Sequence, residues 1–211
     1  MTYKLYGRAG WGSAIVEVQL EWYGLAYEFE ALGDLFKSAE AREKLAKINP
    51  LHQVPTLVMP DGQVMSESAA ITLLLADITG QDSLVPGAGA KERGRFLRWL
   101  VYIVANIYPT FTYADDPSRF VAVKEAQAPF KASVDAYAQR LWRQLEAEAT
   151  GPWFLGERMS ALDIYLGVMT RWRPGRPWFE ANTPKLLAAA RRAEELPKLK
   201  AVWARNLPKP G

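Results

Sequence analysis

Hydrophobic and polar positions in the first 80 residues alternate between two periods, one typical of strands and one typical of helices. Ser13 stands where a helix cap belongs, and Gly24 stops the apolar run that follows it. Pro60-Asp-Gly62 between two strand-like runs predicts an antiparallel hairpin. The order βαβαββα indicates an α/β unit. Its expected elements are strand 2–7, helix 13–23, strand 26–29, helix 39–48, strands 55–59 and 63–65, and a helix through 71–78.

The rest of the chain has a helical pattern. Residues 79–90 are rich in Gly, Ser, Asp and Pro and have no periodicity, so we place a boundary there. Apolar stripes over 96–107 and 130–145 are too long for strands, and Ser160 with Asp163 forms a capping-box pattern before another apolar run. The expected division is a first domain at 1–80, a linker at 81–90 and an all-helical domain at 91–211.

Composition narrows the class of function. The 211 residues are 49% hydrophobic, which is ample for a packed core, and the formal net charge is only +3 without long runs of one sign. We therefore expect no nucleic acid as a partner. Neither a secretory leader nor a membrane-spanning stretch is visible, so we expect a cytoplasmic protein without a membrane partner.

The chain has no cysteine and one histidine, His52. The lack of cysteine excludes disulfides, thiolate metal sites and every mechanism in which a protein cysteine is the nucleophile. A transition-metal site would need a cage of carboxylates, and no such spacing is present. We expect no metal, and we expect His52 to be a surface turn residue.

Three segments carry a family resemblance. Asn49-Pro-Leu-His-Gln-Val-Pro-Thr-Leu57, followed by Asp61-Gly62 and by Glu67-Ser68-Ala-Ala-Ile71, resembles the signature of the glutathione transferase N-terminal domain. Gly156-Glu-Arg-Met-Ser160-Ala-Leu-Asp163-Ile-Tyr is similar to the capping motif of the family's C-terminal domain. The resemblance covers nearly the whole chain and indicates a bacterial-like cytosolic glutathione S-transferase whose class is not assignable. It implies a thioredoxin-like first domain with a mixed four-stranded sheet, followed by an all-helical domain.

The resemblance also implies how glutathione would bind. The Val54-Pro55 bond is expected to be cis, so that the Val54 backbone faces the ligand and pairs with the cysteinyl backbone of glutathione. Glu67 and Ser68 are expected in the first turn of a helix. The Ser68 hydroxyl and the helix amides suit the γ-glutamyl carboxylate, and the Glu67 carboxylate suits the ammonium group. Gln53 is expected to reach the glycyl carboxylate.

The group that would activate the thiol stays open among three candidates. By resemblance, the position of the family's catalytic serine or cysteine falls on Gly10, or on Gly12 in the beta-like class, and neither has a donor side chain. The Ser13 hydroxyl is the first candidate, although a capping role suits it equally. Tyr6 is the second, although a tyrosine there is often part of the core. The third is the backbone of Gly12 and Ser13 at the helix start.

We expect a pocket for an apolar electrophile between the first loop and the first helix of the second domain, with most of its candidate residues packing rather than touching ligand. The candidates are Trp11, Tyr102, Asn106, Tyr108, Tyr113 and Trp172.

The resemblance implies a transferase of detoxification type that attaches glutathione to a hydrophobic electrophile or uses it on a peroxide. One alternative is a cysteine-free, glutathione-dependent disulfide reductase. Another is a non-catalytic glutathione-binding or scaffold protein of the same fold. The expected assembly is a homodimer, because two-fold dimers are the commonest closed assembly.

Overall fold

The computed structural model of the chain describes residues 2–207 and divides into two compact units. The first unit joins residues 1–85 to 192–211, and the second comprises residues 86–191. The elements of the first part of the chain follow the expected βαβαββα order. They are β1 (Tyr3–Gly7), α1 (Ser13–Tyr23), β2 (Tyr27–Ala31), α2 (Ala39–Ala46), β3 (Thr56–Val58), β4 (Val64–Met65) and α3 (Ser68–Thr79).

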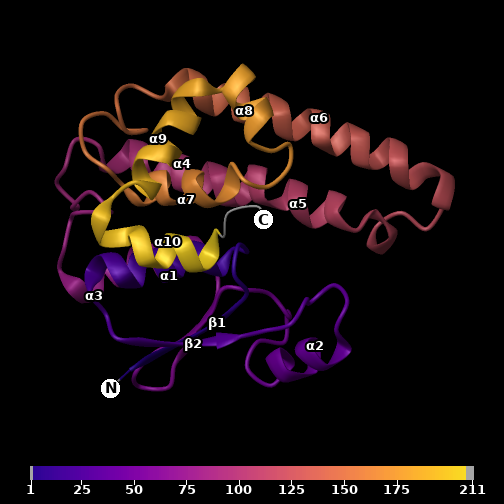
Figure 1. Cartoon of the computed structure of the whole chain (residues 1–211), viewed down its shortest axis with the longest axis horizontal. Coiled ribbons are helices and arrows are strands. Elements are labelled where there is room, and N and C mark those ends of the chain that lie inside the picture. Colours follow the sequence, from indigo (N-terminus) through magenta and orange to yellow (C-terminus); the bar gives the residue numbers. More distant parts are fainter. Residues whose placement is uncertain (1, 208–211) are drawn as a thin grey trace. The chain divides into compact units, whose positions relative to one another are not determined.

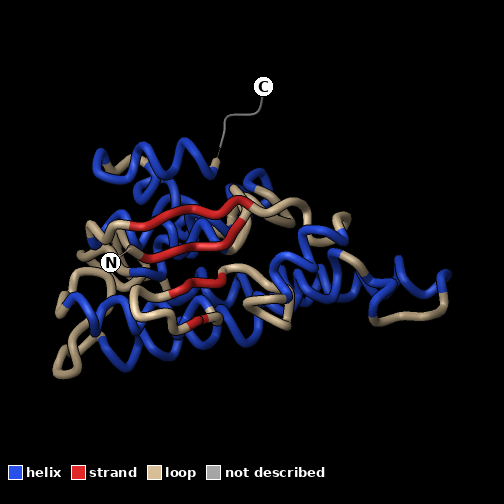
Figure 2. The backbone as a smooth tube through the Cα atoms, turned by 90° about the horizontal axis from the view of Figure 1, so that it is seen from below, coloured by secondary structure: helices blue, strands red, loops and turns tan. Residues whose placement is uncertain are grey.

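The sheet has four strands in the order β2-β1-β3-β4, which lie side by side in Figure 2. β1 pairs in parallel with β2 and antiparallel with β3, and β3 pairs antiparallel with β4. The hairpin turn contains Gly62 at φ 91°, a conformation that favours glycine, and its amide donates to the Met59 carbonyl at 2.9 Å. The expected mixed sheet and thioredoxin-like fold are confirmed.

The two faces of β1 contact different helices. A side chain at Gly7 would lie 2.3 Å from Ser13 Cβ, so the residues of β1 that share its parity face α1. Tyr6 points to the other face, where it joins a buried cluster with Leu45 of α2 and with Leu32 and Leu35. The end of the first strand and the start of the first helix are therefore held together by a contact that only glycine permits.

The last helix, α10 (Lys200–Asn206), runs alongside α1 in the first unit (Figure 1). Val202 and Trp203 are buried, and the Trp203 indole N–H donates to the Ala193 carbonyl at 2.9 Å. The helical pattern predicts one group over residues 91–211, but packing places the described residues from Arg192 onward with the first unit. The expected linker lies in residues 80–92, which form no helix or strand, and its exact limits stay a prediction.

The second unit is helical apart from its connecting segments. Its stripe at 96–107 was expected to form one helix, but a π-helical segment at Ile103–Ile107 interrupts it just before Pro109. Proline provides no amide for the helical ladder, and insertions of this kind are frequent at functional sites. The helices are α4 (Arg93–Tyr102), α5 (Tyr108–Asp115), α6 (Lys124–Glu148), α7 (Ala161–Met169), α8 (Arg176–Asn182) and α9 (Pro184–Glu194), of which α9 ends beyond the unit.

The expected capping box at the start of α7 is present. Asp163 is buried, and its carboxylate accepts hydrogen bonds from the amide of Ser160 at 2.8 Å, from the Ser160 hydroxyl at 3.1 Å and from the amide of Phe154 at 2.8 Å. Burial raises the pKa of Asp163 to about 6, although these hydrogen bonds oppose the shift. One carboxyl thus joins α7 to the loop before it.

The raised pKa of Asp163 predicts a specific dependence of stability on pH. The folded chain keeps the proton until about pH 6, whereas an unfolded aspartate releases it near pH 4. The free energy of unfolding should therefore fall by about 2 kcal/mol as pH rises from 4 to 7. Denaturation by urea at several pH values checks this, with Asp163→Asn as the variant that cannot titrate. Parallel pH profiles for the two proteins would contradict the prediction.

Candidate functional site: a peptide-binding edge in the first unit

The turn between β1 and α1 is closed by one side chain. The Ser13 hydroxyl accepts a hydrogen bond from the amide of Arg8 at 3.0 Å and donates to the carbonyl of the same residue at 2.9 Å. Ser13 is fully buried and is the first residue of α1, with Gly12 at the N-cap position. The capping role expected for Ser13 is therefore wrong. Its only proton is already donated to Arg8, so in this structure the hydroxyl is a structural group.

Two backbone amides at the start of α1 remain open. Ala14 donates to the Trp11 carbonyl at 2.9 Å and Ile15 to that of Gly12 at 3.2 Å. Within residues 2–207, no hydrogen bond engages the amides of Gly12 or Ser13. They lie at the positive end of the dipole of an 11-residue helix, where a negative group is stabilised. This end of α1 can accept an anion without a donor side chain.

The segment before β3 presents a second set of open backbone groups. The Val54–Pro55 bond is cis, as the resemblance implies, and Val54 is half-buried. Neither its N–H nor its C=O has a hydrogen-bond partner among the described residues. The preceding carbonyl of Gln53 is held from inside by Asn49 Nδ2 at 3.1 Å and Thr56 Oγ1 at 2.8 Å. The exposed edge at Val54 can therefore pair with an extended peptide.

The start of α3 forms the third part of the site. Ser68 is its first residue and is 7% exposed, whereas Glu67 stands just before the helix and is exposed. The expectation that both lie in the first turn is wrong for Glu67, which adopts φ 65°. A positive φ is rare outside glycine and is found most often where surrounding structure imposes it for function. The amides of Ser68, Ala69 and Ala70 precede the first bonded amide, that of Ile71.

A buried polar chain connects α1 and α3. Gln19 Nε2 donates to Thr72 Oγ1 at 2.9 Å, and Thr72 Oγ1 donates to the Ser68 carbonyl at 2.8 Å. Gln19 and Thr72 are both fully buried. These two residues were not singled out in the sequence, where a Gln and a Thr on apolar helix faces carry no signal of contact. The chain fixes the rotation of α3, and hence the direction of its first amides, relative to α1.

Tyr6 and Trp11 have distinct surroundings. Tyr6 is 8% exposed and belongs to the buried cluster beside α2, against which Trp11 and Val54 also pack. Tyr6 is therefore a core residue, which is the role that a tyrosine at this position often has. Trp11 contacts the ring of Phe36 at 5.3 Å between centroids, and the Arg8 guanidinium lies 5.2 Å from its ring. Trp11 therefore brings the first loop and the Val54 edge against one cluster.

Comparison with known proteins identifies the family. A family model for the N-terminal domain of glutathione S-transferases matches residues 13–78, which include Ser13, Val54 and the start of α3. The uncharacterized GST-like protein YncG of Escherichia coli K12 is 39% identical over 204 residues, which cover 96% of this chain and 98% of YncG. The chain belongs to the glutathione S-transferase family.

Solved structures agree with this assignment. A glutathione transferase of Methylococcus capsulatus superposes with a TM-score of 0.77 at 31% identity, over 95% of this chain and 97% of that one. A sphingomonad glutathione S-transferase, solved in complex with glutathione, gives a TM-score of 0.76 at 27% identity, over 94% and 96% of the two chains. The likeness thus extends through the helical part.

In this family member, the aromatic candidates of the second unit do not form one group. Tyr108 and Trp172 lie together, with 5.5 Å between their ring centroids, and Phe111 completes a cluster with edge-to-face contacts. Phe111 was not among the expected residues, although its spacing from Tyr108 on α5 is a helical one. Arg173 covers the Phe111 ring at 5.7 Å and is ion-paired with Asp115 and Asp135.

The other three candidates of that unit have separate neighbours. The Tyr102 hydroxyl donates to Gln144 Oε1 on α6 at 3.0 Å, and its ring contacts Trp99. Asn106 belongs to the π-helical segment, and its Nδ2 donates to the Tyr102 carbonyl at 3.3 Å. Tyr113 packs on Phe120. Their place in an electrophile pocket stays a prediction.

The described part of the chain shows no group of three His, Asp or Glu side chains that could bind a metal ion. Nor does any helix in residues 2–207 have the length and apolar character needed to cross a bilayer.

The polar chain between α1 and α3 predicts unequal effects of two similar substitutions. Thr72→Val would leave one of the two Gln19 Nε2 hydrogens without an acceptor in a fully buried place, while Nε2 keeps its bond to the Ile15 carbonyl, so the free energy of unfolding should fall by about 1 to 3 kcal/mol. Thr79→Val is the matched control, because the Thr79 hydroxyl bonds only to carbonyls of its own helix at a half-buried position. Urea denaturation of both variants measures the difference. Equal losses would show that the link between the helices contributes nothing.

Proposed function

We propose that the chain is a glutathione transferase that binds glutathione in the first unit and presents it as a thiolate. The observation that carries this proposal is the open backbone edge of Val54, which lies in the same unit as two helix starts with open amides. A peptide with a carboxylate at one end and a sulfur in the middle needs these three recognition elements. Family membership supports the proposal from a separate direction.

The roles of the residues follow from the groups that each one leaves open. The Val54 N–H and C=O pair with the cysteinyl backbone of glutathione. The γ-glutamyl carboxylate binds to the Ser68 hydroxyl and the first amides of α3, and the exposed Glu67 carboxylate binds the ammonium. Gln53 is exposed and reaches the glycyl carboxylate through its side-chain amide. Pro55 is buried and holds the turn in place.

For the thiolate, we place the activating donors on the backbone of Gly12 and Ser13 rather than on a side chain. Their amides are open, whereas the hydroxyl of Ser13 is committed to Arg8. Donation to the ionised sulfur, together with the dipole of α1, lowers the thiol pKa. Ser13 then acts as a positioning residue, because its hydroxyl sets the path of the chain from residue 8 to residue 13.

The reaction proposed is a nucleophilic displacement or addition. The thiol proton leaves to solvent and the thiolate sulfur forms a bond to an electrophilic carbon. In a displacement the leaving group departs with the electron pair of the broken bond, and in an addition the π electron pair moves to the neighbouring atom, which takes a proton from solvent. The Tyr108, Phe111 and Trp172 cluster offers aromatic surface to an apolar electrophile. The catalytic contribution of the chain is positioning of the sulfur and stabilisation of its charge. A two-fold homodimer stays a prediction.

One second candidate has an observation in its favour. At the three positions where the family resemblance or the helix start would place a donor, no side chain is available among the described residues, because Gly10 and Gly12 have none and the Ser13 hydroxyl is committed to Arg8. A glutathione-binding protein without transferase activity would have the same first unit. The ionisation state of bound glutathione separates the two functions.

Replacing Glu67 should weaken glutathione binding without unfolding the chain. Glu67→Gln is the sharper variant, because it keeps the side-chain size and the backbone conformation at φ 65° while removing the charge. Loss of the ammonium partner should cost about 1 to 3 kcal/mol of binding free energy. Isothermal titration calorimetry measures this loss, with Glu43→Gln at an exposed site on α2 as the control. Equal affinity in both variants would refute the role of Glu67.

The thiol pKa of bound glutathione, followed by ultraviolet absorbance against pH, tests thiolate formation directly. The wild-type complex should be ionised at neutral pH, where free glutathione is largely a thiol. Ser13→Ala should destabilise the fold by about 1 to 3 kcal/mol, because two Arg8 backbone groups lose their partner.

The control for Ser13 is Ser38→Ala. Ser38 caps α2 by accepting from the Ala41 amide at 3.1 Å, so its loss should cost about 1 kcal/mol and leave the thiol pKa unchanged. Ser13→Gly also removes the hydroxyl and leaves the backbone amide of residue 13 in place. A thiol pKa of bound glutathione that stays near the wild-type value in Ser13→Gly would assign activation to the amides. Glutathione bound to the wild-type chain as a neutral thiol would exclude the transferase proposal.

A further inference from the structure

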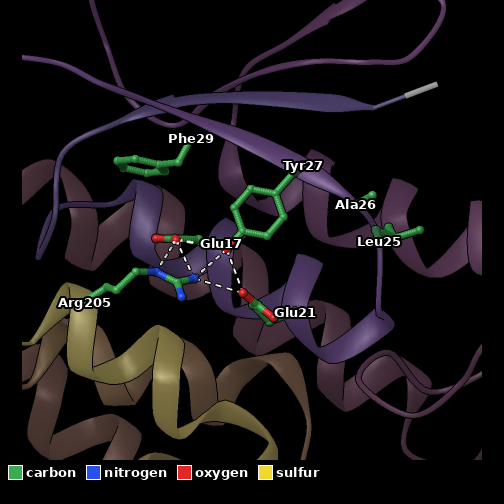
Figure 3. Close-up of a pocket in the computed structure, with 7 residues that line it drawn as sticks. All are labelled: Glu17, Glu21, Leu25, Ala26, Tyr27, Phe29 and Arg205. Carbon is green, nitrogen blue, oxygen red and sulfur yellow. Dashed lines mark hydrogen bonds and ion pairs between the residues drawn. The ribbon is translucent and has the colours of Figure 1, made fainter.

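A buried carboxylate in the middle of α1 is held from the end of the chain (Figure 3). Glu17 is 3% exposed. Its Oε1 accepts from Arg205 Nη2 at 3.0 Å and from the Tyr27 hydroxyl at 3.0 Å, and its Oε2 accepts from Asn206 Nδ2 at 2.6 Å. Arg205 and Asn206 form the last turn of α10. A charge this deeply buried is tolerated only with such partners, so α10 and α1 depend on each other.

The network continues to the surface but leaves little for a ligand to bind. Arg205 Nη2 also donates to Glu21 Oε1 at 2.9 Å and to the Tyr27 hydroxyl at 2.7 Å. Burial and the adjacent Glu17 carboxylate raise the pKa of Tyr27, so its hydroxyl remains a donor. These groups line a shallow depression of about 420 Å³. Because its polar atoms already bond to one another, the depression is the outer face of a cross-link and not a binding site.

The same turn of α10 also touches the loop before α1. A Cβ atom at Gly10 would lie 3.2 Å from the carbonyl oxygen of Asn206, and Gly10 adopts φ 76°. Asn206 therefore lies close to the chain on both sides of the helix start, with its carbonyl near Gly10 and its side chain bonded to Glu17. Gly12 and Ser13, whose amides are open, lie between these two contacts along the chain.

We propose that Arg205 and Asn206, acting through Glu17 and Gly10, are positioning residues for the amides that activate glutathione. This C-terminal clamp, defined as Glu17, Arg205 and Asn206, holds the first turn of α1 at a fixed direction. The inference rests on the proposed function for its catalytic meaning, but the effect of the clamp on the helix start does not. The network spans 188 residues of sequence, so an intact α10 is a condition for an ordered thiolate site.

A second contact of the same segment supplies the control. Lys198 Nζ donates to the Trp22 carbonyl at 2.5 Å and lies 5.1 Å from the centre of the Trp22 ring, near the far end of α1. Lys198→Met removes this contact and leaves the clamp. A general loosening of the C-terminal segment affects both ends of α1, whereas loss of the clamp affects its start.

The first measurement needs no ligand. Amide hydrogen exchange of the full chain is followed at Trp11, Ala14 and Ile15, whose amides are bonded within the turn. Asn206→Leu, which keeps the number and branching of the side-chain heavy atoms and removes the donor, should speed exchange at these amides about tenfold relative to Lys198→Met. Equal exchange rates in the two variants would overturn the inference, irrespective of the thiol pKa of bound glutathione.

The second measurement is the thiol pKa of bound glutathione. Asn206→Leu should raise it by about one unit, which reduces the thiolate fraction near neutrality up to tenfold, and Lys198→Met should not. A wild-type complex with an ionised thiol and an Asn206→Leu complex with the same thiol pKa would overturn the inference and leave the proposed function intact. A wild-type complex without thiolate would overturn the proposed function, and hydrogen exchange would then decide the clamp.

Arg205 provides a variant that does not depend on a buried residue, because half of its side chain is exposed. Arg205→Met should act in the same direction as Asn206→Leu in both measurements. Arg205→Lys keeps a cation near Glu17 and should restore most of the wild-type behaviour. If Arg205→Met leaves both readouts at wild-type values, the guanidinium is no part of the clamp and the inference fails for it.

Discussion

The double hydrogen bond between the Ser13 hydroxyl and the backbone of Arg8 is the interaction on which the rest of the site depends. A buried peptide group without a partner is costly, and the turn after β1 is too short to satisfy itself through secondary structure. Ser13 closes the turn because Gly7 lets it approach to a distance that any larger residue would forbid. The helix that follows is thereby started with its first amides unbonded.

The same solution recurs at the other two parts of the site. The carbonyl next to Val54 is bound from inside by Asn49 and Thr56, and the carbonyl of Ser68 is bound by Thr72. In each case a buried side chain satisfies one backbone group and leaves the neighbouring one open to the surface. Recognition is built from main-chain atoms whose directions are set by polar side chains in the interior.

Local patterns in the sequence were sufficient for most elements of the fold. The structure confirms three of them: the alternation of periods, the Pro60-Asp-Gly62 turn and the Ser160–Asp163 box. Each depends on a few consecutive residues and not on partners that are distant in the sequence. The capping role predicted for Ser13 is wrong, because a serine at a helix start can bond either forward to the helix or backward to the preceding loop. Residue type does not distinguish the two.

Long-range features gave no such signal. Nothing at Glu17 indicates that Arg205 will cover it, because the partner is 188 residues away and both are ordinary residues of helix surfaces. The π-helical segment before Pro109 and the positive φ of Glu67 are likewise products of tertiary packing. Motifs predict a candidate site within the first unit, but the side chains that orient its backbone groups are visible only in three dimensions.

Open main-chain amides at the start of α1 have a consequence for how the site responds to change. A peptide N–H is common to every residue except proline, so no ordinary exchange of side chain at position 12 or 13 deletes the donor itself. Nor does an amide gain or lose a proton between acidic and alkaline pH, unlike a tyrosine or cysteine donor. The direction of such amides depends on the shape of the turn, so substitutions at residues that do not contact the ligand can alter the strength of donation.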